Sequence, residues 1–181
     1  MNRHGGRTAR LCGTAMLLAS LVLAACAGTP ATQTHGDDGP VFVVVRHGEK
    51  ADAGGSDPPL SEAGLARADR LAGLLADATL VAVYSTDLRR TRQTVGPTAA
   101  AHGLGIQAYD PREAAADFAA RLRAAHGAGT VLVAGHSNTV PDIVAALCAC
   151  EVAAMPETEF DRLSTLRSGA DGRLQLEISR Y

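Results

Sequence analysis

Short runs of β-branched and apolar residues alternate along the chain with longer stretches in which Ala, Leu and Arg recur at helical spacing. The first run, VFVVV at 41–45, contains no polar position, which is typical of a strand covered on both faces. The same pattern predicts five further strands and four helices. The strands are expected at 80–84, 106–109, 130–134, 163–166 and 174–178, and the helices at 61–77, 88–102, 112–126 and 139–150.

Strand–helix alternation predicts an α/β fold, a three-layer sandwich with a mostly parallel sheet and helices on both faces. Ser61 is expected to cap the first helix, whose apolar stripe would be formed by Leu65, Leu71, Leu74 and Leu75. The last two strands flank a turn at 168–172 and predict a terminal hairpin. Ligands of such folds bind beyond the carboxyl ends of the strands.

Residues 1–25 have the pattern of a signal peptide. Arg3, Arg7 and Arg10 precede an uncharged apolar run at 11–25, which is shorter than the ~20 residues of a membrane-spanning helix. The sequence LAAC at 23–26 resembles the lipobox of bacterial lipoproteins, which implies acylation of Cys26. That resemblance implies a periplasm-facing lipoprotein of the cell envelope, and Ala27 favours the outer membrane. The alternative is an ordinary cleaved signal in which Cys26 is incidental.

The remaining chain is predicted to be a flexible tether at 26–39 and one domain at 40–181. Beyond residue 25 it carries 14 Lys and Arg against 19 Asp and Glu, a net charge of −5. Nucleic-acid binding is not expected, because the chain has no basic stripe, no Trp and only three Tyr and three Phe as stacking groups. Cys148 and Cys150 are predicted to be buried and structural, since on a helix their side chains diverge.

Three predicted strands run directly into polar turns: RHGEK at 46–50, STDLRRTRQT at 85–94 and GHSNT at 135–139. Parallel strands would bring these turns to one edge of the sheet, where histidines and arginines meet. Such a cluster of cationic donors is suited to an anion, and Arg in particular to phosphate. By contrast, His102 and His126 end predicted helices and precede Gly, which indicates structural roles at left-handed caps.

These three turns carry the resemblance to a known family. Arg46-His47-Gly48 resembles the RHG motif of the histidine phosphatase superfamily, the phosphoglycerate-mutase-like group, in its short phosphatase branch. The stretch at 85–94 is similar to the block that holds its phosphate-binding arginine, which falls on Arg90. The turn at 135–139 resembles the block of its second histidine, His136. The likeness extends from residue 41 to about 178.

The resemblance implies a phosphatase in which neutral His47 attacks phosphorus while its other ring nitrogen donates to a backbone carbonyl. Arg46, Arg90 and His136 would bind the equatorial oxygens of the phosphoryl group. Water would then hydrolyse the phosphohistidine. No cofactor and no metal is needed, and the expected partner is a small phosphorylated substrate.

The proton donor for the leaving oxygen is less evident. Phytase-like members have Asp after the second histidine, where this chain has Ser137, which is expected to make a minor substrate contact. Mutase-like members have an acid after the third strand, which points to Asp110 or, second, to Glu113, with a pKa raised by burial. Asp110 could instead, or also, cap a helix. Lys50 lies in the first loop, where it could touch substrate or simply face solvent.

Two other functions are compatible with the same residues. A phosphoglycerate-mutase-type transfer uses the same phosphohistidine, but it needs segments that retain the product, for which this domain has little room. A non-catalytic, anion-binding envelope lipoprotein would belong to a different class. The retention of His47, Arg46, Arg90 and His136 together favours hydrolysis over simple binding.

Overall fold

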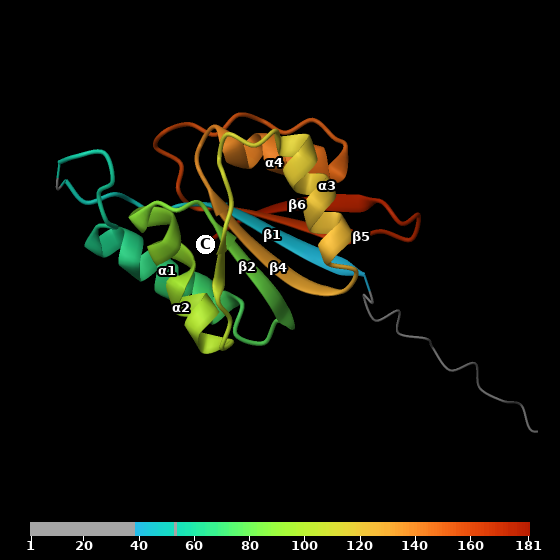
Figure 1. Cartoon of the computed structure of the whole chain (residues 1–181), viewed down its shortest axis with the longest axis horizontal. Helices are drawn as coiled ribbons and strands as arrows, with labels where there is room; N and C mark the ends of the chain where they lie inside the picture. Colours follow the sequence, from blue (N-terminus) through green and yellow to red (C-terminus); the bar gives the residue numbers. More distant parts are fainter. Residues whose placement is uncertain (1–38, 53) are drawn as a thin grey trace, which may run out of the picture. The chain divides into compact units, whose positions relative to one another are not determined.

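The computed structural model describes residues 39–52 and 54–181, which form a six-stranded sheet between two helical layers (Figure 1). The predicted signal peptide, the Cys26 anchor and nearly all of the tether lie outside these residues. The strands are β1 (Pro40–Arg46), β2 (Leu80–Ser85), β3 (Ile106–Ala108), β4 (Gly129–Gly135), β5 (Arg162–Ser168) and β6 (Leu174–Arg180). The helices are α1 (Glu62–Leu74), α2 (Arg89–Ala101), α3 (Ala115–Ala125) and α4 (Thr139–Cys148).

The strand order is β3-β2-β4-β1-β5-β6, and the four strands from β3 to β1 are parallel. The antiparallel strands β5 and β6 form the predicted terminal hairpin and extend the sheet beyond β1. The predicted α/β sandwich with a mostly parallel sheet is therefore confirmed. None of the helices among the described residues is long and apolar enough to cross a membrane.

The central strand β1 is buried on both faces and divides the core in two. Phe42 and Val44 pack in the cluster under α3 and α4, whereas Val41, Val43 and Val45 pack in the cluster under α1 and α2. Alternate residues of a strand point to opposite faces, so a run without polar positions suits a strand with helices on each side. In Figure 1 the two helix pairs lie on opposite faces of the sheet.

Helix α1 begins as predicted, because the Ser61 hydroxyl accepts a hydrogen bond from the Gly64 amide. Its predicted apolar stripe is only partly correct. Leu71 and Leu75 are buried, but Leu65 and Leu74 are 46% and 59% exposed. Small residues, Gly64 and Ala68, take the buried positions instead and allow α1 to approach its neighbours closely.

The predicted start of the third helix and one of the predicted left-handed glycines are wrong. Helix α3 begins at Ala115 after a turn at 111–113, so Asp110 does not cap it; the Asp110 carboxylate accepts the Arg112 amide hydrogen bond at 2.9 Å. Of the two predicted left-handed glycines, Gly103 has a φ of +65° as expected after α2. Gly127 does not adopt this conformation, which occurs at Gly129 instead.

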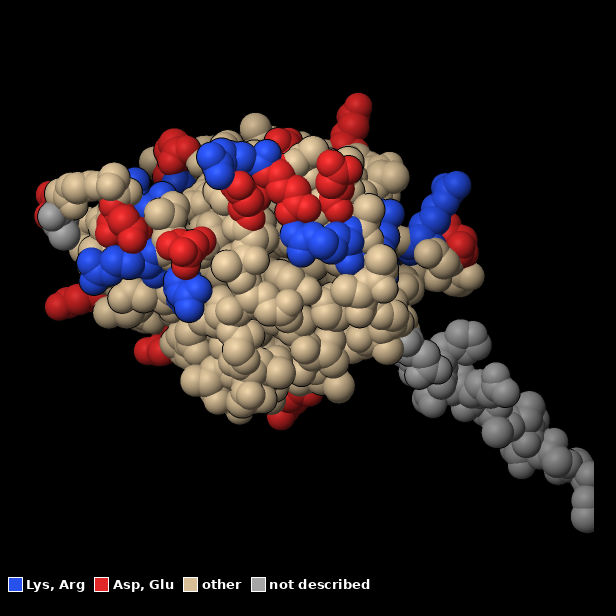
Figure 2. Space-filling model, in the orientation of Figure 1, with Lys and Arg blue, Asp and Glu red and all other residues tan. Residues whose placement is uncertain are grey.

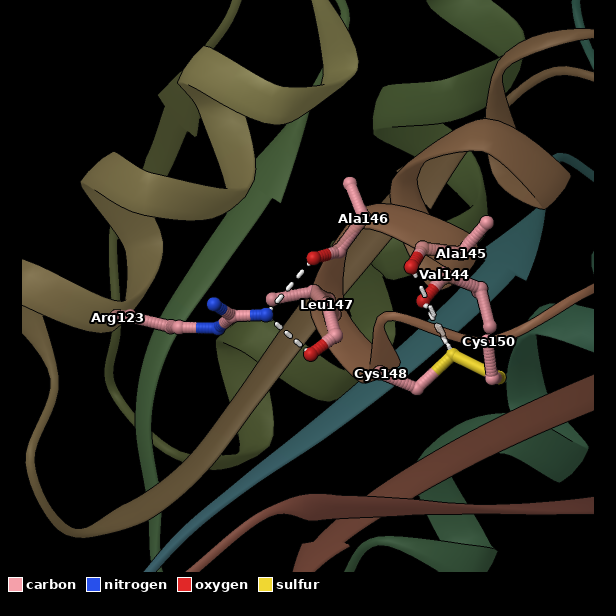
Figure 3. Close-up of a disulfide and its surroundings, with 7 residues drawn as sticks. All are labelled: Arg123, Val144, Ala145, Ala146, Leu147, Cys148 and Cys150. Carbon is pink, nitrogen blue, oxygen red and sulfur yellow. Dashed lines mark hydrogen bonds between the residues drawn. A yellow bond between two sulfur atoms is a disulfide. The ribbon is translucent and has the colours of Figure 1, made fainter.

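The prediction of two buried cysteine thiols is also wrong, because Cys148 and Cys150 form a disulfide (Figure 3). Helix α4 ends at Cys148, and Ala149 turns the chain with a φ of +51°. This turn brings the two Cα atoms to 5.2 Å, within the range of a disulfide, which the straight helix assumed from the sequence would not allow. Cys150 is exposed.

Arg123 of α3 binds the carboxyl end of α4. Its guanidinium donates to the carbonyl oxygens of Ala146 and Leu147, as Figure 3 shows. These are carbonyls of the last helical turn, which have no partner within the helix. Helix α4 is therefore held at its carboxyl end by a cation and by the disulfide that follows.

Candidate active site

The strand register brings the three polar turns together. Arg46, the last residue of β1, pairs with Gly135, the last residue of β4, and Ser85 of β2 pairs with Ala134. The amide of His47 continues the β1–β4 ladder by donating to the Gly135 carbonyl at 3.0 Å. The predicted convergence at one sheet edge is thus confirmed by the geometry.

His47 lies on the floor of this edge and is 3% exposed. Its Nδ1 lies 2.7 Å from the carbonyl oxygen of Gly48. A carbonyl only accepts, so Nδ1 carries the proton and Nε2 of the neutral ring keeps its lone pair. Burial, with smaller contributions from His136 and Arg90, lowers the pKa of His47 to about 4. The ring is therefore neutral and its free nitrogen is a potential nucleophile at neutral pH.

His136 meets His47 edge to face, with ring centroids 5.4 Å apart and an interplanar angle of 65°. Its Nε2 is hydrogen-bonded to the Thr86 hydroxyl, which follows β2. Burial, followed by the charges of Arg90 and Arg46, lowers the pKa of His136 to about 4 as well. The two histidine rings are neutral. The positive charge of the site therefore comes from the guanidinium groups of Arg46 and Arg90.

Helix α2 holds the loop that carries His47. The Gly48 amide donates to the Thr94 hydroxyl at 2.9 Å, and that hydroxyl donates to the Arg90 carbonyl at 2.8 Å. On the other side Gly48 approaches Gly64 of α1, where an added Cβ would lie 3.0 Å from the Gly64 Cα. The loop is therefore fixed between two helices, and its position depends on two small residues.

Arg46 is almost fully buried and is held by a segment that the sequence did not identify. Its Nη1 lies within 3.0 Å of the carbonyl oxygens of Pro156, Glu157 and Glu159, and its guanidinium carbon lies 4.2 Å from the centre of the Phe160 ring. Residues 156–160 precede β5 and form no helix or strand, so no periodic pattern marks them. Burial lowers the pKa of Arg46.

Several guanidinium nitrogens of the site have no hydrogen-bond acceptor among the described residues. They are the Nε of Arg46 and the Nε and Nη1 of Arg90, and all three are buried. Arg90 Nη1 lies 3.7 Å from the Asp57 carboxylate, which is too long for a hydrogen bond. Buried donors without partners are rare in proteins and are found where a ligand supplies the acceptor. An oxyanion is the ligand that three such donors fit.

Glu157 and Ser137 lie next to Arg46, and the charge of Lys50 acts on Glu157. The Glu157 carboxylate accepts from Arg46 Nη2 at 2.6 Å and from the Ser137 hydroxyl. The positive charge of Lys50 contributes to the lowering of the Glu157 pKa, after the hydrogen bond from Ser137 and the charge of Arg46. The predicted substrate contact Ser137 is thus bound to Glu157, a carboxylate that sequence reasoning did not consider.

The two predicted proton donors lack the buried environment expected of them. Asp110 is exposed and forms a two-point ion pair with Arg112, which lowers its pKa to about 2. Glu113 pairs with Arg121 at 2.6 Å. The expectation of a pKa raised by burial is therefore wrong for Asp110. Both residues line a small cavity together with residues of α3 and α4.

The arrangement is suited to an anion and shows no metal-binding geometry. No group of three or more His, Cys, Asp or Glu side chains in residues 39–52 and 54–181 is placed to hold a metal ion. Acidic and basic side chains are interspersed over the upper part of the face shown in Figure 2, and Arg46 of the site is 1% exposed.

Comparison with known proteins supports this assignment of the fold. The family model "Histidine phosphatase superfamily (branch 1)" matches residues 42–114. No curated protein matches the chain by sequence. Among solved structures, the protein histidine phosphatase SixA in complex with tungstate is similar, with 20% identity, a TM-score of 0.61, and coverage of 77% of this chain and 96% of SixA.

Two further structures show the same fold. A SixA from Agrobacterium tumefaciens is 25% identical, with a TM-score of 0.57 and coverage of 77% of this chain and 97% of that one. A mycobacterial glucosyl-3-phosphoglycerate phosphatase is 17% identical, with a TM-score of 0.55 and coverage of 78% and 97%. The fold is that of the histidine phosphatases, and the family model matches less than half of the chain, residues 42–114.

Proposed function

We propose that this chain hydrolyses phosphomonoesters through a covalent phosphohistidine on His47, without a metal ion. The observation that carries the proposal is the set of buried, unpartnered guanidinium nitrogens on Arg46 and Arg90 beside a neutral imidazole. A binding site for a simple counter-ion needs the arginines, but it does not need a nucleophile whose tautomer is set by a backbone carbonyl. That second feature supports catalysis.

In the first step His47 Nε2 attacks phosphorus and the ester oxygen leaves. Arg46, Arg90 and His136 stabilise the equatorial oxygens, on which charge is concentrated during phosphoryl transfer. In the second step water attacks the phosphohistidine and releases inorganic phosphate. Hydrolysis of phosphate monoesters requires accelerations that reach ~10²¹-fold, so electrostatic stabilisation is combined here with a covalent intermediate.

The test is turnover of 4-nitrophenyl phosphate by the purified protein, with and without a chelator. We expect hydrolysis that the chelator does not reduce, and loss of at least ~10³-fold in His47→Ala with an unchanged far-UV circular dichroism spectrum. Acid-quenched protein should retain labelled phosphate in the wild type and not in the variant. Equal turnover by His47→Ala would refute the mechanism. Absence of turnover by the wild type across a broad panel of phosphoesters would favour an anion-binding lipoprotein.

Small phosphorylated molecules are the proposed substrates. SixA, which has a similar fold, is described as a protein histidine phosphatase. We favour small phosphoesters for this chain because the N-terminal pattern predicts export, which would separate it from cytosolic phosphoproteins. Transfer of the mutase type remains the second reaction compatible with a phosphohistidine. Product analysis distinguishes them, since hydrolysis releases inorganic phosphate and a mutase returns an isomeric phosphoester.

The proposed location is the periplasmic side of the cell envelope, with an anchor at Cys26. The support is the sequence at 11–26 alone. Several acyl chains on one residue would hold the protein stably on a membrane, because a single chain binds only reversibly. Cys26→Ser should therefore move the protein from the membrane fraction to the soluble fraction. Membrane retention by this variant would contradict acylation of Cys26.

A further inference from the structure

The reaction proposed above needs a proton for the leaving oxygen, and the residues that were expected to supply it are paired elsewhere. Asp110 is bound to Arg112 and Glu113 to Arg121. Glu49 is occupied by Arg67, whose Nε donates to it at 3.0 Å. His136 is neutral at physiological pH, because its lowered pKa leaves it unprotonated.

Glu157 and Asp57 are the described carboxylates that contact the two arginines of the site. Asp57 accepts a hydrogen bond from the Arg89 amide at 2.9 Å, which ties it to the start of α2. Glu157 instead belongs to the irregular segment 156–160, and its side chain is 78% exposed. One of its oxygens binds Arg46 Nη2 and the other binds Ser137. Glu157 can therefore move a short distance without breaking an element of the fold.

The direction of attack determines where a proton donor must lie. In-line displacement puts the leaving oxygen opposite the attacking nitrogen. His47 is 3% exposed whereas the Glu157 side chain is 78% exposed, and the proposal puts the leaving oxygen on the solvent side, next to Glu157. A groove of about 340 Å³ lies beside Glu157 and is lined by Ser137, Pro141, Val152 and Met155 among others. This groove is large enough to receive a small leaving group.

We propose that Glu157 is the proton donor of this reaction, on the condition that the chain is the phosphatase described above. The hydrogen bond from Ser137 and the charges of Arg46 and Lys50 lower the pKa of the Glu157 carboxyl. A phosphoryl dianion that binds Arg46 displaces Glu157 from that cation and adds negative charge beside it, and both effects favour its protonated form.

The proton balance closes over the two steps. Protonated Glu157 transfers its proton to the ester oxygen as the bond from phosphorus to that oxygen breaks and the bond from phosphorus to His47 Nε2 forms. The alcohol leaves, and Glu157 is a carboxylate. It then takes a proton from the water that attacks the phosphohistidine. Hydrogen phosphate leaves, neutral His47 is restored, and Glu157 is protonated again.

The experiment compares leaving groups in Glu157→Gln, in the matched control Asp57→Asn and in the wild type. The substrates are aryl and alkyl phosphates that cover a wide range of leaving-group pKa. For Glu157→Gln we expect kcat/KM to fall about 10²-fold or more with alkyl phosphates and much less with 4-nitrophenyl phosphate, because a stable phenolate needs little protonation. Gln keeps an acceptor for Arg46. For Asp57→Asn any loss should be the same for every substrate.

A second readout is proton uptake when tungstate binds, measured by calorimetry at pH 7.5 in buffers of different ionisation enthalpy. We expect greater uptake by the wild type than by Glu157→Gln. Equal uptake, or a loss in Glu157→Gln that does not depend on the leaving group, would overturn the role of Glu157 and leave the phosphohistidine mechanism intact. Failure of the proposed function is recognised separately, since the wild type would then turn over no phosphoester.

Discussion

The Nε2 of His136 lies 3.1 Å from the hydroxyl oxygen of Thr86, a residue that follows a different strand. Thr86 is fully buried, and its hydroxyl is also 2.7 Å from that of Thr91 in the first turn of α2. The His136 ring, which would contact the phosphoryl group, is therefore oriented by Thr86, which belongs to a different turn.

Removal of this hydroxyl should weaken catalysis. Thr86→Val keeps the shape of the side chain but leaves a ring nitrogen of His136 without its partner, which costs about 1 kcal/mol or more. We expect kcat/KM to fall about five- to tenfold, measured with 4-nitrophenyl phosphate. Thr86→Ser keeps the hydroxyl and should lose less. Equal losses in the two variants would mean that the methyl group, and not the hydrogen bond, positions the ring.

Stability should decrease as the pH falls from 6.5 towards 4. The folded protein lowers the pKa of His47 and of His136 to about 4, whereas the unfolded chain titrates near 6.5. Between these values the unfolded chain binds more protons, so the free energy of unfolding rises with pH. Urea unfolding at pH 7 and pH 4.5 should differ by roughly 2 to 3 kcal/mol from His47 alone. His47→Gln should reduce this difference; an unchanged pH dependence in that variant would contradict the assignment.

Two glycines of α1 should respond oppositely to the same substitution. At Gly64 an added Cβ would lie 2.4 Å from the Glu49 carbonyl oxygen, so Gly64→Ala should destabilise the protein by about 1–3 kcal/mol and displace the loop of His47. At Gly73 nothing lies within 4 Å of the added atom. Gly73→Ala should stabilise the helix by about 0.5–1 kcal/mol. Thermal unfolding measures both effects, and a stabilising Gly64→Ala would show that the close approach is not rigid.

Asp110 and Glu113 should be dispensable for proton transfer. Each carboxylate forms an ion pair with a neighbouring arginine at the surface, and surface pairs contribute little. We expect Asp110→Asn and Glu113→Gln to change kcat by no more than about twofold with either alkyl or aryl phosphates. A loss confined to alkyl phosphates in one of them would identify that residue as the donor and exclude Glu157.

The sequence was sufficient for the strands, for three of the four helix starts and for the convergence of His47 with His136. Apolar runs such as 41–45 identify buried strands, and parallel strands must bring their carboxyl ends to one edge. The family resemblance implied a backbone carbonyl as the partner of the His47 ring, and the structure shows that it is the carbonyl of Gly48, the next residue. These features depend on neighbours in the chain or on the topology that the strand pattern implies.

Contacts between distant and irregular segments were decided by the tertiary structure. Arg46 is clamped by residues about 110 positions later, which have no periodic pattern to reveal them. The Cys148–Cys150 disulfide depends on a left-handed turn at Ala149, a conformation that its sequence does not favour. The environment of Asp110 was misjudged because burial is a property of the packed chain. A sequence determines which groups lie at strand ends, whereas packing decides which of these groups are buried and which form hydrogen bonds or ion pairs.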